Sequence, residues 1–217
     1  MKRLITVMLF CATFFAAAQS DYRQVVLKRK GELHTKVPAV DNKVADKALQ
    51  ISSYLFSRKE FQDSVARLSF PYYNHCKDCG HGKNKEEVIQ GKIILDSIFR
   101  RPVTALELYI EPVGRKKPRL RSDPENNKCF GLGNTCPDSY ITSYYENINC
   151  DMAHELPFSC AYAVHISHEY LHFVGYCHKT KDVNTDIAEA VGWIAYYFIK
   201  KWYDGKDAGL MQILAEV

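Results

Sequence analysis

Three of the chain's eight histidines lie within the eleven residues HEYLHFVGYCH, which run from His168 to His178. His168 and His172 are four residues apart, so on a helix their imidazoles share one face and lie one turn apart. Glu169 stands beside His168 and can lean toward the same point without binding a metal. The spacing predicts that both imidazoles reach one zinc ion, with a carboxylate within reach of a zinc-bound water.

A catalytic zinc site takes three protein ligands and keeps its fourth position for water. Gly175 can adopt a left-handed conformation that ends the helix and turns the chain back, and His178 follows three residues later. We therefore predict that His178 joins His168 and His172 as a metal ligand. A water in the fourth position would then lie within reach of Glu169.

The simpler alternative is a helix that carries incidental histidines on a polar face. The neighbours Leu171, Phe173 and Val174 are apolar, however, which indicates a partly buried helix. Three uncoordinated imidazoles would be costly to bury in such a helix. The pattern therefore favours a metal site.

HEYLHFVGYCH matches every fixed position of HExxHxxGxxH, and over these residues the chain resembles the metzincin group of zincin metallopeptidases. The resemblance implies Zn²⁺ as cofactor and an α+β, zincin-like fold with a small mixed sheet, an active-site helix and a long C-terminal helix. Metzincins also carry a methionine turn beneath the zinc, which is not evident here, since Met152 precedes the motif and Met211 follows the last long helix. Other zincins use a downstream carboxylate as third ligand, so three alternatives to His178 stay open: Asp182, Asp186 and Glu189.

Hydrophobic periodicity places these residues among helices and strands. We expect two helices in 40–69 and further helices over 85–100, 158–174 and 184–203, the last capped by Asn184 or Thr185. Strands are expected at 104–111 and 139–149, and loops at 70–82 and 112–137. The strand at 139–149 is a candidate edge for pairing with an extended peptide. Tyr144, Tyr145 and Tyr176 are available as oxyanion donors.

The N-terminus is typical of an exported protein. Lys2 and Arg3 precede an almost unbroken apolar run that ends in Ala16–Ala18, which predicts a signal peptide at 1–18. Residues 19–37 are interpreted as a leader arm, a short propeptide or an edge strand, and 38–217 as a single domain. Signal removal lowers the net charge from +4 to about +2, which is too weak to indicate nucleic-acid binding.

The signal peptide contains one of the eight cysteines, so an odd number remains in the mature chain. Export favours disulfides, and an odd count leaves at least one thiol outside any intrachain bridge. Cys76 and Cys79 lie close to His75 and His81, but a disulfide role is preferred to a second metal site. Cys177 is predicted to form a bridge that fixes the turn before His178.

Together these features predict a zinc-dependent endopeptidase that is secreted or periplasmic and acts on protein or peptide substrates. No nucleic-acid partner is expected, and no membrane association after signal cleavage; the oligomeric state stays open. Glu169 takes a proton from the zinc-bound water and passes it to the leaving amine. The alternatives are a catalytically inactive zincin-fold binding protein and a zinc amidase that acts on cell-wall peptide.

Overall fold

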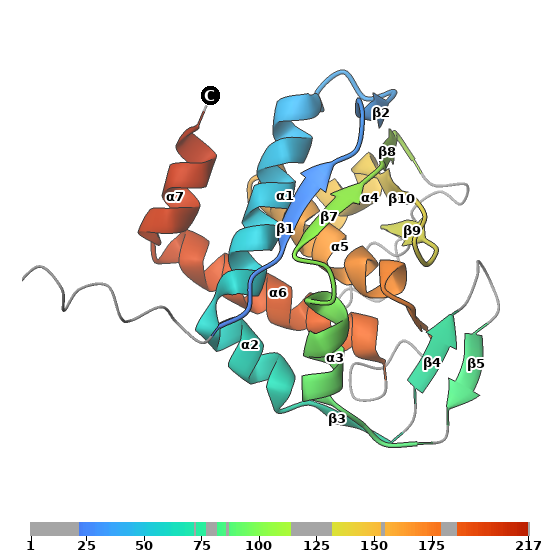
Figure 1. Ribbon diagram of the computed structural model, residues 1–217. Coiled ribbons are helices and arrows are strands. Elements are labelled where there is room, and N and C mark those ends of the chain that lie inside the picture. The colour runs from blue at the N-terminus through green and yellow to red at the C-terminus, as the bar shows by residue number, and fades with distance from the viewer. Residues whose placement is uncertain are drawn as a thin grey trace, which may run out of the picture.

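The computed structural model describes residues 22–71, 73–76, 82–85, 87–113, 132–152, 155–178 and 186–216. These residues form a mixed α+β structure with small sheets, as expected from the sequence (Figure 1). The predicted signal peptide at 1–18 lies outside the described residues. No helix in the described ranges combines the length and apolarity that a membrane span requires.

Three long helices form the centre of the fold. Helix α1 (Asn42–Ser57) begins at Asp41, whose side chain accepts a hydrogen bond from the Val44 amide. It packs on α5 (Phe158–Phe173), which in turn packs on α6 (Ile187–Asp204). Helix α5 is buried on nearly all sides, as expected of a helix through the core. The two helices expected in 40–69 are confirmed as α1 and α2 (Lys59–Ala66).

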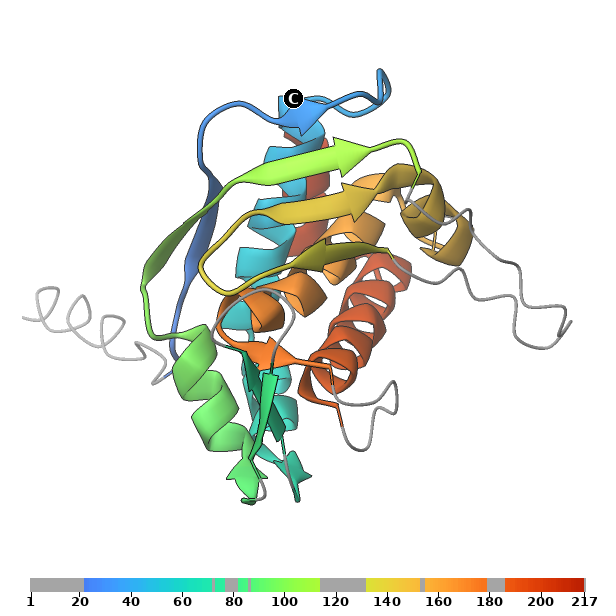
Figure 2. The same cartoon turned by 90° about the vertical axis from the view of Figure 1, so that its right-hand side faces the viewer.

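A four-stranded sheet covers α1 and α5 on one side (Figure 2). Its order is β2 (His34–Thr35), β8 (Leu108–Glu111), β10 (Ile141–Tyr144) and β9 (Gly133–Thr135). The first three strands are parallel, and β9 runs antiparallel to β10 at the sheet edge. The strand expected at 139–149 is therefore an inner strand and not an edge, and it ends where α4 (Tyr145–Met152) begins.

The strand expected at 104–111 is divided between two sheets. Its first part is β7 (Val103–Leu106), which pairs in parallel with β1 (Val26–Arg29), and its second part is β8. Strands β1 and β2 both lie in the N-terminal segment at 19–37, and Val25 and Leu27 of that segment are buried in the core. The described residues of this segment therefore include two strands that lie at sheet edges.

The prediction of a loop at 70–82 is wrong for the residues of this range that the structure describes. Strand β4 (Tyr73–Cys76) lies between β11 (Tyr176–Cys177) and β5 (Gly82–Lys85) in a three-stranded antiparallel sheet. Nearby, β3 (Ser69–Phe70) pairs with β6 (Ile89–Gln90), so the helix expected at 85–100 begins later, as α3 (Gly91–Ile98).

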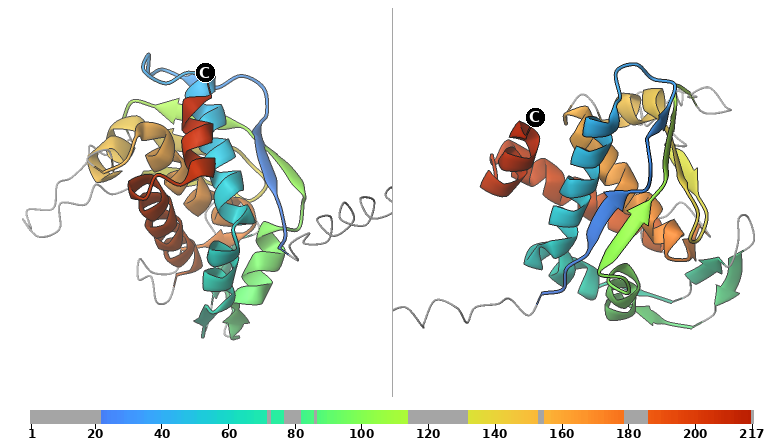
Figure 3. Two further views of the ribbon diagram at one scale, coloured as in Figure 1. Left: turned by 90° about the vertical axis from the view of Figure 1, so that its left-hand side faces the viewer. Right: turned by 45° about the horizontal axis from the view of Figure 1, so that its top comes forward.

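A short C-terminal helix, α7 (Ala208–Ala215), was not expected from the sequence. It packs against α1 on the side away from the sheet (Figure 3). Leu210 is fully buried there, and the Tyr54 hydroxyl donates to Asp207, the N-cap residue of α7. Met211 lies on this helix and Met152 on α4, so neither occupies a turn directly after the histidine motif.

Candidate metal centre

Helix α5 supplies the first two histidines of the candidate site. His168 and His172 lie one turn apart in its last two turns, and their ring centroids are 4.9 Å apart. Residue 192 of α6 is a glycine, and a Cβ at that position would come within 3.0 Å of the Nδ1 atom of His168. The missing side chain therefore allows α6 to approach the ring of His168 closely.

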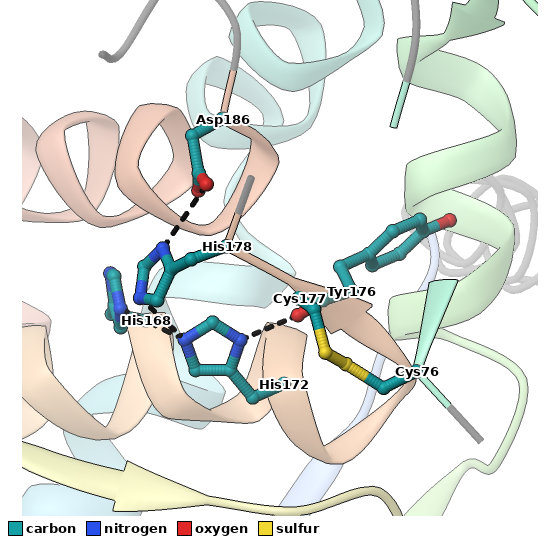
Figure 4. The surroundings of a disulfide bond; sticks show 7 residues. All are labelled: Cys76, His168, His172, Tyr176, Cys177, His178 and Asp186. Carbon is teal, nitrogen blue, oxygen red and sulfur yellow. Dashed lines mark hydrogen bonds and ion pairs between the residues drawn. A yellow bond between two sulfur atoms is a disulfide. The ribbon is translucent and has the colours of Figure 1, made fainter. Parts of the chain in front are cut away.

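The third histidine reaches the site through a turn and a short strand. Gly175 has a φ of +105°, a value that L-residues rarely adopt, and it separates α5 from β11. His178 follows β11 directly and returns toward α5 (Figure 4). The predicted use of this glycine to end the helix and reverse the chain is therefore observed.

The three Nε2 atoms converge on one point. The Nε2 atom of His172 lies 3.2 Å from that of His168 and 3.0 Å from that of His178. Nitrogen ligands at about 2.0–2.1 Å from a tetrahedral zinc are about 3.3–3.4 Å apart, so the observed separations fit a shared ion closely. The three residues offer ligand atoms within 4.8 Å of one another and could hold a metal ion.

The other side of each ring is held by the protein. Nδ1 of His172 donates to the Tyr176 carbonyl at 2.5 Å, and Nδ1 of His178 lies 3.1 Å from Oδ2 of Asp186. The ring of His168 hydrogen-bonds with the backbone of Ala188. Such partners fix the orientation and tautomer of metal-binding histidines. Where Nδ1 is the protonated nitrogen of a neutral ring, its Nε2 lone pair is left for a shared cation.

The electrostatic environment keeps two of the rings neutral. Burial lowers the pKa of His168 well below its ordinary value, and neighbouring His172 and His178 lower it further. Burial likewise lowers the pKa of His172 to about 4. At neutral pH both are therefore in the uncharged form that binds metal. Burial also lowers the pKa of His178, but the hydrogen bond and charge of Asp186, with the charge of Glu189, outweigh it and the net change is a rise.

Asp186 both caps α6 and contacts His178, and neither role was predicted from the sequence. Its Oδ1 atom accepts a hydrogen bond from the Glu189 amide and caps α6, while its Oδ2 atom contacts His178. The cap expected at Asn184 or Thr185 is therefore wrong. Aspartate is as good an N-cap as either, so this role was open to prediction.

Of the three carboxylates considered as alternative third ligands, the two that the structure describes do not take that position. Asp186 approaches the Nδ1 side of the His178 ring, opposite the converging Nε2 atoms. Glu189 lies on the same side, with Oε1 4.0 Å from Nδ1 of His178. Asp182 lies outside the described residues. Of the candidates that can be placed, His178 is the one that completes the histidine cluster.

Glu169 is buried beside this cluster. Its side chain is 5% exposed, and Oε2 has no hydrogen-bond partner in the described part of the chain. Burial raises the pKa of Glu169 to about 7, and the nearby Thr135 hydroxyl and His178 offset part of that rise. A carboxylate with a pKa near neutrality can both accept and return a proton at physiological pH.

His165 lies behind Glu169 and is not part of the cluster. Its Nε2 atom hydrogen-bonds with the Ser143 hydroxyl at 3.1 Å, and its Nδ1 atom is 3.7 Å from Oε1 of Glu169. Burial lowers the pKa of His165 to about 3, so the ring is neutral and forms no ion pair with Glu169. The sequence placed His165 one turn before His168 but could not indicate this contact with Ser143.

The cysteines and tyrosines singled out in and near the motif make mainly structural contacts. Cys177 forms a disulfide with Cys76, as its predicted bridging role requires. The Tyr176 hydroxyl, one of the candidate oxyanion donors, lies 2.8 Å from Oγ of Ser97 and shares a hydrogen bond with it. Tyr145 packs its ring on Phe158. Cys136 and Cys150 are also disulfide-bonded, and the described free thiol is the buried Cys160.

Strand β9 is one of the elements near the site that sequence patterns missed, as are β4 and β11. It lies in the predicted loop at 112–137, packs against α5 and forms the free edge of the four-stranded sheet among the described strands. Three residues that include a glycine carry too little periodicity to identify a strand.

We expect Asp186→Asn to weaken metal binding by about 10- to 100-fold, the range for losing a partner that orients a metal ligand. Asparagine preserves the helix cap, so the variant removes the carboxylate next to His178 without removing the start of α6. Competition with a chromogenic chelator measures the change. Glu189→Gln serves as the control, because that carboxylate lies 4.0 Å from the same nitrogen and should affect affinity little. Equal affinities for Asp186→Asn and wild type would contradict the orienting role.

No family model, curated protein or solved structure matches the chain.

Proposed function

We propose that the protein is an exported zinc-dependent endopeptidase of the zincin type, with His168, His172 and His178 as ligands and Glu169 as general base. The observation that carries the proposal is the convergence of three Nε2 atoms beside a buried carboxylate. A structural zinc site is usually closed by four protein ligands, whereas three leave a position for water. The donor set and its spacing fit zinc, which prefers nitrogen ligands in tetrahedral geometry.

Access to the site supports a catalytic role over a structural one. The side chain of His178 is 42% exposed, whereas His172 is 7% exposed and Glu169 is 5% exposed. Solvent therefore reaches the cluster from the side of His178, while the base lies in a low-dielectric environment. A low dielectric strengthens electrostatic interactions with a developing charge.

The chain's own residues define the catalytic steps. A bound zinc ion would supply Lewis-acid polarisation of a peptide carbonyl and acidify water. Glu169 takes a proton from the attacking water and later passes it to the leaving amine. Burial raises the pKa of Glu169 and so strengthens it as a proton acceptor. The partners of the three rings keep Nε2 of each histidine directed at one point throughout.

Strand β9 is the element we propose for substrate alignment, in place of the strand first expected at 139–149. It is the sheet edge and packs on α5, the helix that contains the histidines. An extended peptide can add to such an edge through backbone hydrogen bonds, which is a general mode of peptide recognition. This position favours a protein or peptide substrate.

Export is proposed from two features of the chain. The N-terminal apolar run resembles a signal peptide, and the Cys76–Cys177 disulfide is typical of oxidising compartments. Together they favour a secreted or periplasmic location.

The protein purified from the exported fraction should cleave casein, lose this activity with a chelator and regain it with zinc. The reason is that the metal, and not the fold alone, polarises the peptide carbonyl and acidifies the attacking water. Peptide release and metal analysis by mass spectrometry are the measurements. Bound zinc without cleavage of any peptide would indicate a binding protein. Cleavage confined to cell-wall fragments would indicate an amidase, and a chain that binds no zinc would overturn all three.

A further inference from the structure

The three ligands are held to the fold in different ways. His168 and His172 belong to a sixteen-residue buried helix. His178 follows a strand of two residues, β11, and its side chain is 42% exposed. The position of the third ligand therefore depends on what anchors β11, whereas the first two depend on the core.

Strand β11 packs on α5 and α6 and pairs with β4. The strands pair antiparallel, with Tyr176 opposite His75 and Cys177 opposite Asn74, and the Cys76 amide donates to the Gly175 carbonyl at 2.9 Å. A two-residue pairing has few backbone hydrogen bonds and is marginal by itself. The disulfide from Cys76 to Cys177 joins these two strands covalently, immediately before His178 (Figure 4).

Strand β11 also contacts the second ligand. The Tyr176 carbonyl accepts the hydrogen bond from Nδ1 of His172. Displacement of β11 therefore moves His178 and removes the partner that orients His172. Within α5, His168 is independent of this strand, because its ring contacts α6 through Ala188 and Gly192.

We propose that the Cys76–Cys177 disulfide positions His178, so that metal affinity at the triad depends on the oxidation state of this bond. The inference rests on the metal site of the proposed function and adds its regulation. Reduction by a phosphine consumes one water: the phosphine becomes its oxide, the sulfur–sulfur bond breaks, and each sulfur gains one proton and becomes a thiol. The chain then acquires its full metal affinity only where the bond forms, as in an oxidising compartment.

The test compares zinc affinity of wild type with that of a Cys76→Ser/Cys177→Ser double variant, by chelator competition without reductant. We expect affinity about 10- to 100-fold lower in the variant, the range for losing elements that orient metal ligands. The control is Leu210→Ala, which removes a fully buried side chain on α7 and lowers stability away from β11. Its zinc affinity should equal that of wild type at a temperature where all variants are folded.

A double-mutant cycle distinguishes positioning from a general loss of stability. His178→Ala should lower zinc affinity by a larger factor in the wild-type background than in the serine background. In the serine background the disulfide no longer positions the His178 ring, so less affinity remains to be lost. Wild type treated with a phosphine should fall to the affinity of the serine variant, and the serine variant should not respond.

Equal affinities in the two backgrounds, or an equal cost of His178→Ala in both, would overturn the proposal. Loss of the whole fold on removing the bond, seen by circular dichroism in both the serine variant and the reduced wild type, would also overturn it, because the role would then be global. These affinity measurements need no substrate. A wild-type protein that binds zinc but cleaves nothing contradicts the proposed function, and the comparison of zinc affinities still tests this inference. A wild type that binds no zinc contradicts both.

Discussion

Glu169→Gln is expected to lower the rate of peptide hydrolysis at least about a hundredfold while the protein keeps its metal and its fold. Glutamine has nearly the same shape as glutamate, so the buried position remains filled. It cannot accept a proton from the attacking water, and general acid–base catalysis contributes about 10²- to 10⁴-fold. The loss should appear in kcat, because the proton transfer belongs to the chemical step.

The measurement is steady-state hydrolysis of a fluorogenic peptide with metal content determined on the same sample. Glu146→Gln is the matched control, since Glu146 is an exposed carboxylate in the first turn of α4. The control should hydrolyse the peptide at the wild-type rate. Wild-type turnover in Glu169→Gln would remove the proposed mechanism, whereas a variant that loses zinc as well would show that Glu169 also supports the metal site.

His172→Ala should reduce zinc binding by more than about a hundredfold, beyond the range for losing an orienting partner alone. His172 is the central ligand, because its Nε2 atom lies 3.2 Å from that of His168 and 3.0 Å from that of His178. Its removal leaves His168 and His178 as the two remaining histidine ligands. Zinc stoichiometry after gel filtration at micromolar protein measures the effect.

His34→Ala is the control for this variant, because His34 stacks on Tyr109 and belongs to β2 on the four-stranded sheet. It should retain zinc at the wild-type stoichiometry. His172→Ala also leaves the Tyr176 carbonyl without its donor, so some loss of stability is expected, of about 1–3 kcal/mol. Unchanged zinc content in a folded His172→Ala protein would contradict its assignment as a ligand.

Long helices were the elements that sequence patterns predicted best. Helix α5 was expected at 158–174 and spans Phe158–Phe173, and α1 and α2 were both expected in 40–69. A helix of this length repeats its apolar pattern several times, which makes the period distinct. Its boundaries are set by local chemistry, such as Pro157 before α5 and the glycine turn after it.

Short strands were predicted poorly. Strands β4 and β5 lie in or beside a predicted loop, β9 lies in another, and β7 and β8 were read as one strand. Each has three or four residues, too few for an alternating pattern to be recognised. Some of their hydrogen bonds come from partners far along the chain, as in the pairing of β7 with β1 and of β4 with β11, and local sequence contains little information about those pairings.

By itself the sequence determined the helical placement of His168 and His172, the turn at Gly175 and the return of His178, because i to i+4 spacing and a left-handed glycine are properties of neighbouring residues. Only the tertiary structure decided what surrounds them. It brought Asp186 at the start of α6 to His178, and Cys76 to Cys177 across 101 residues. Such contacts depend on how α6 packs against α5 and how β4 pairs with β11, and packing between distant segments leaves no periodic mark in the sequence.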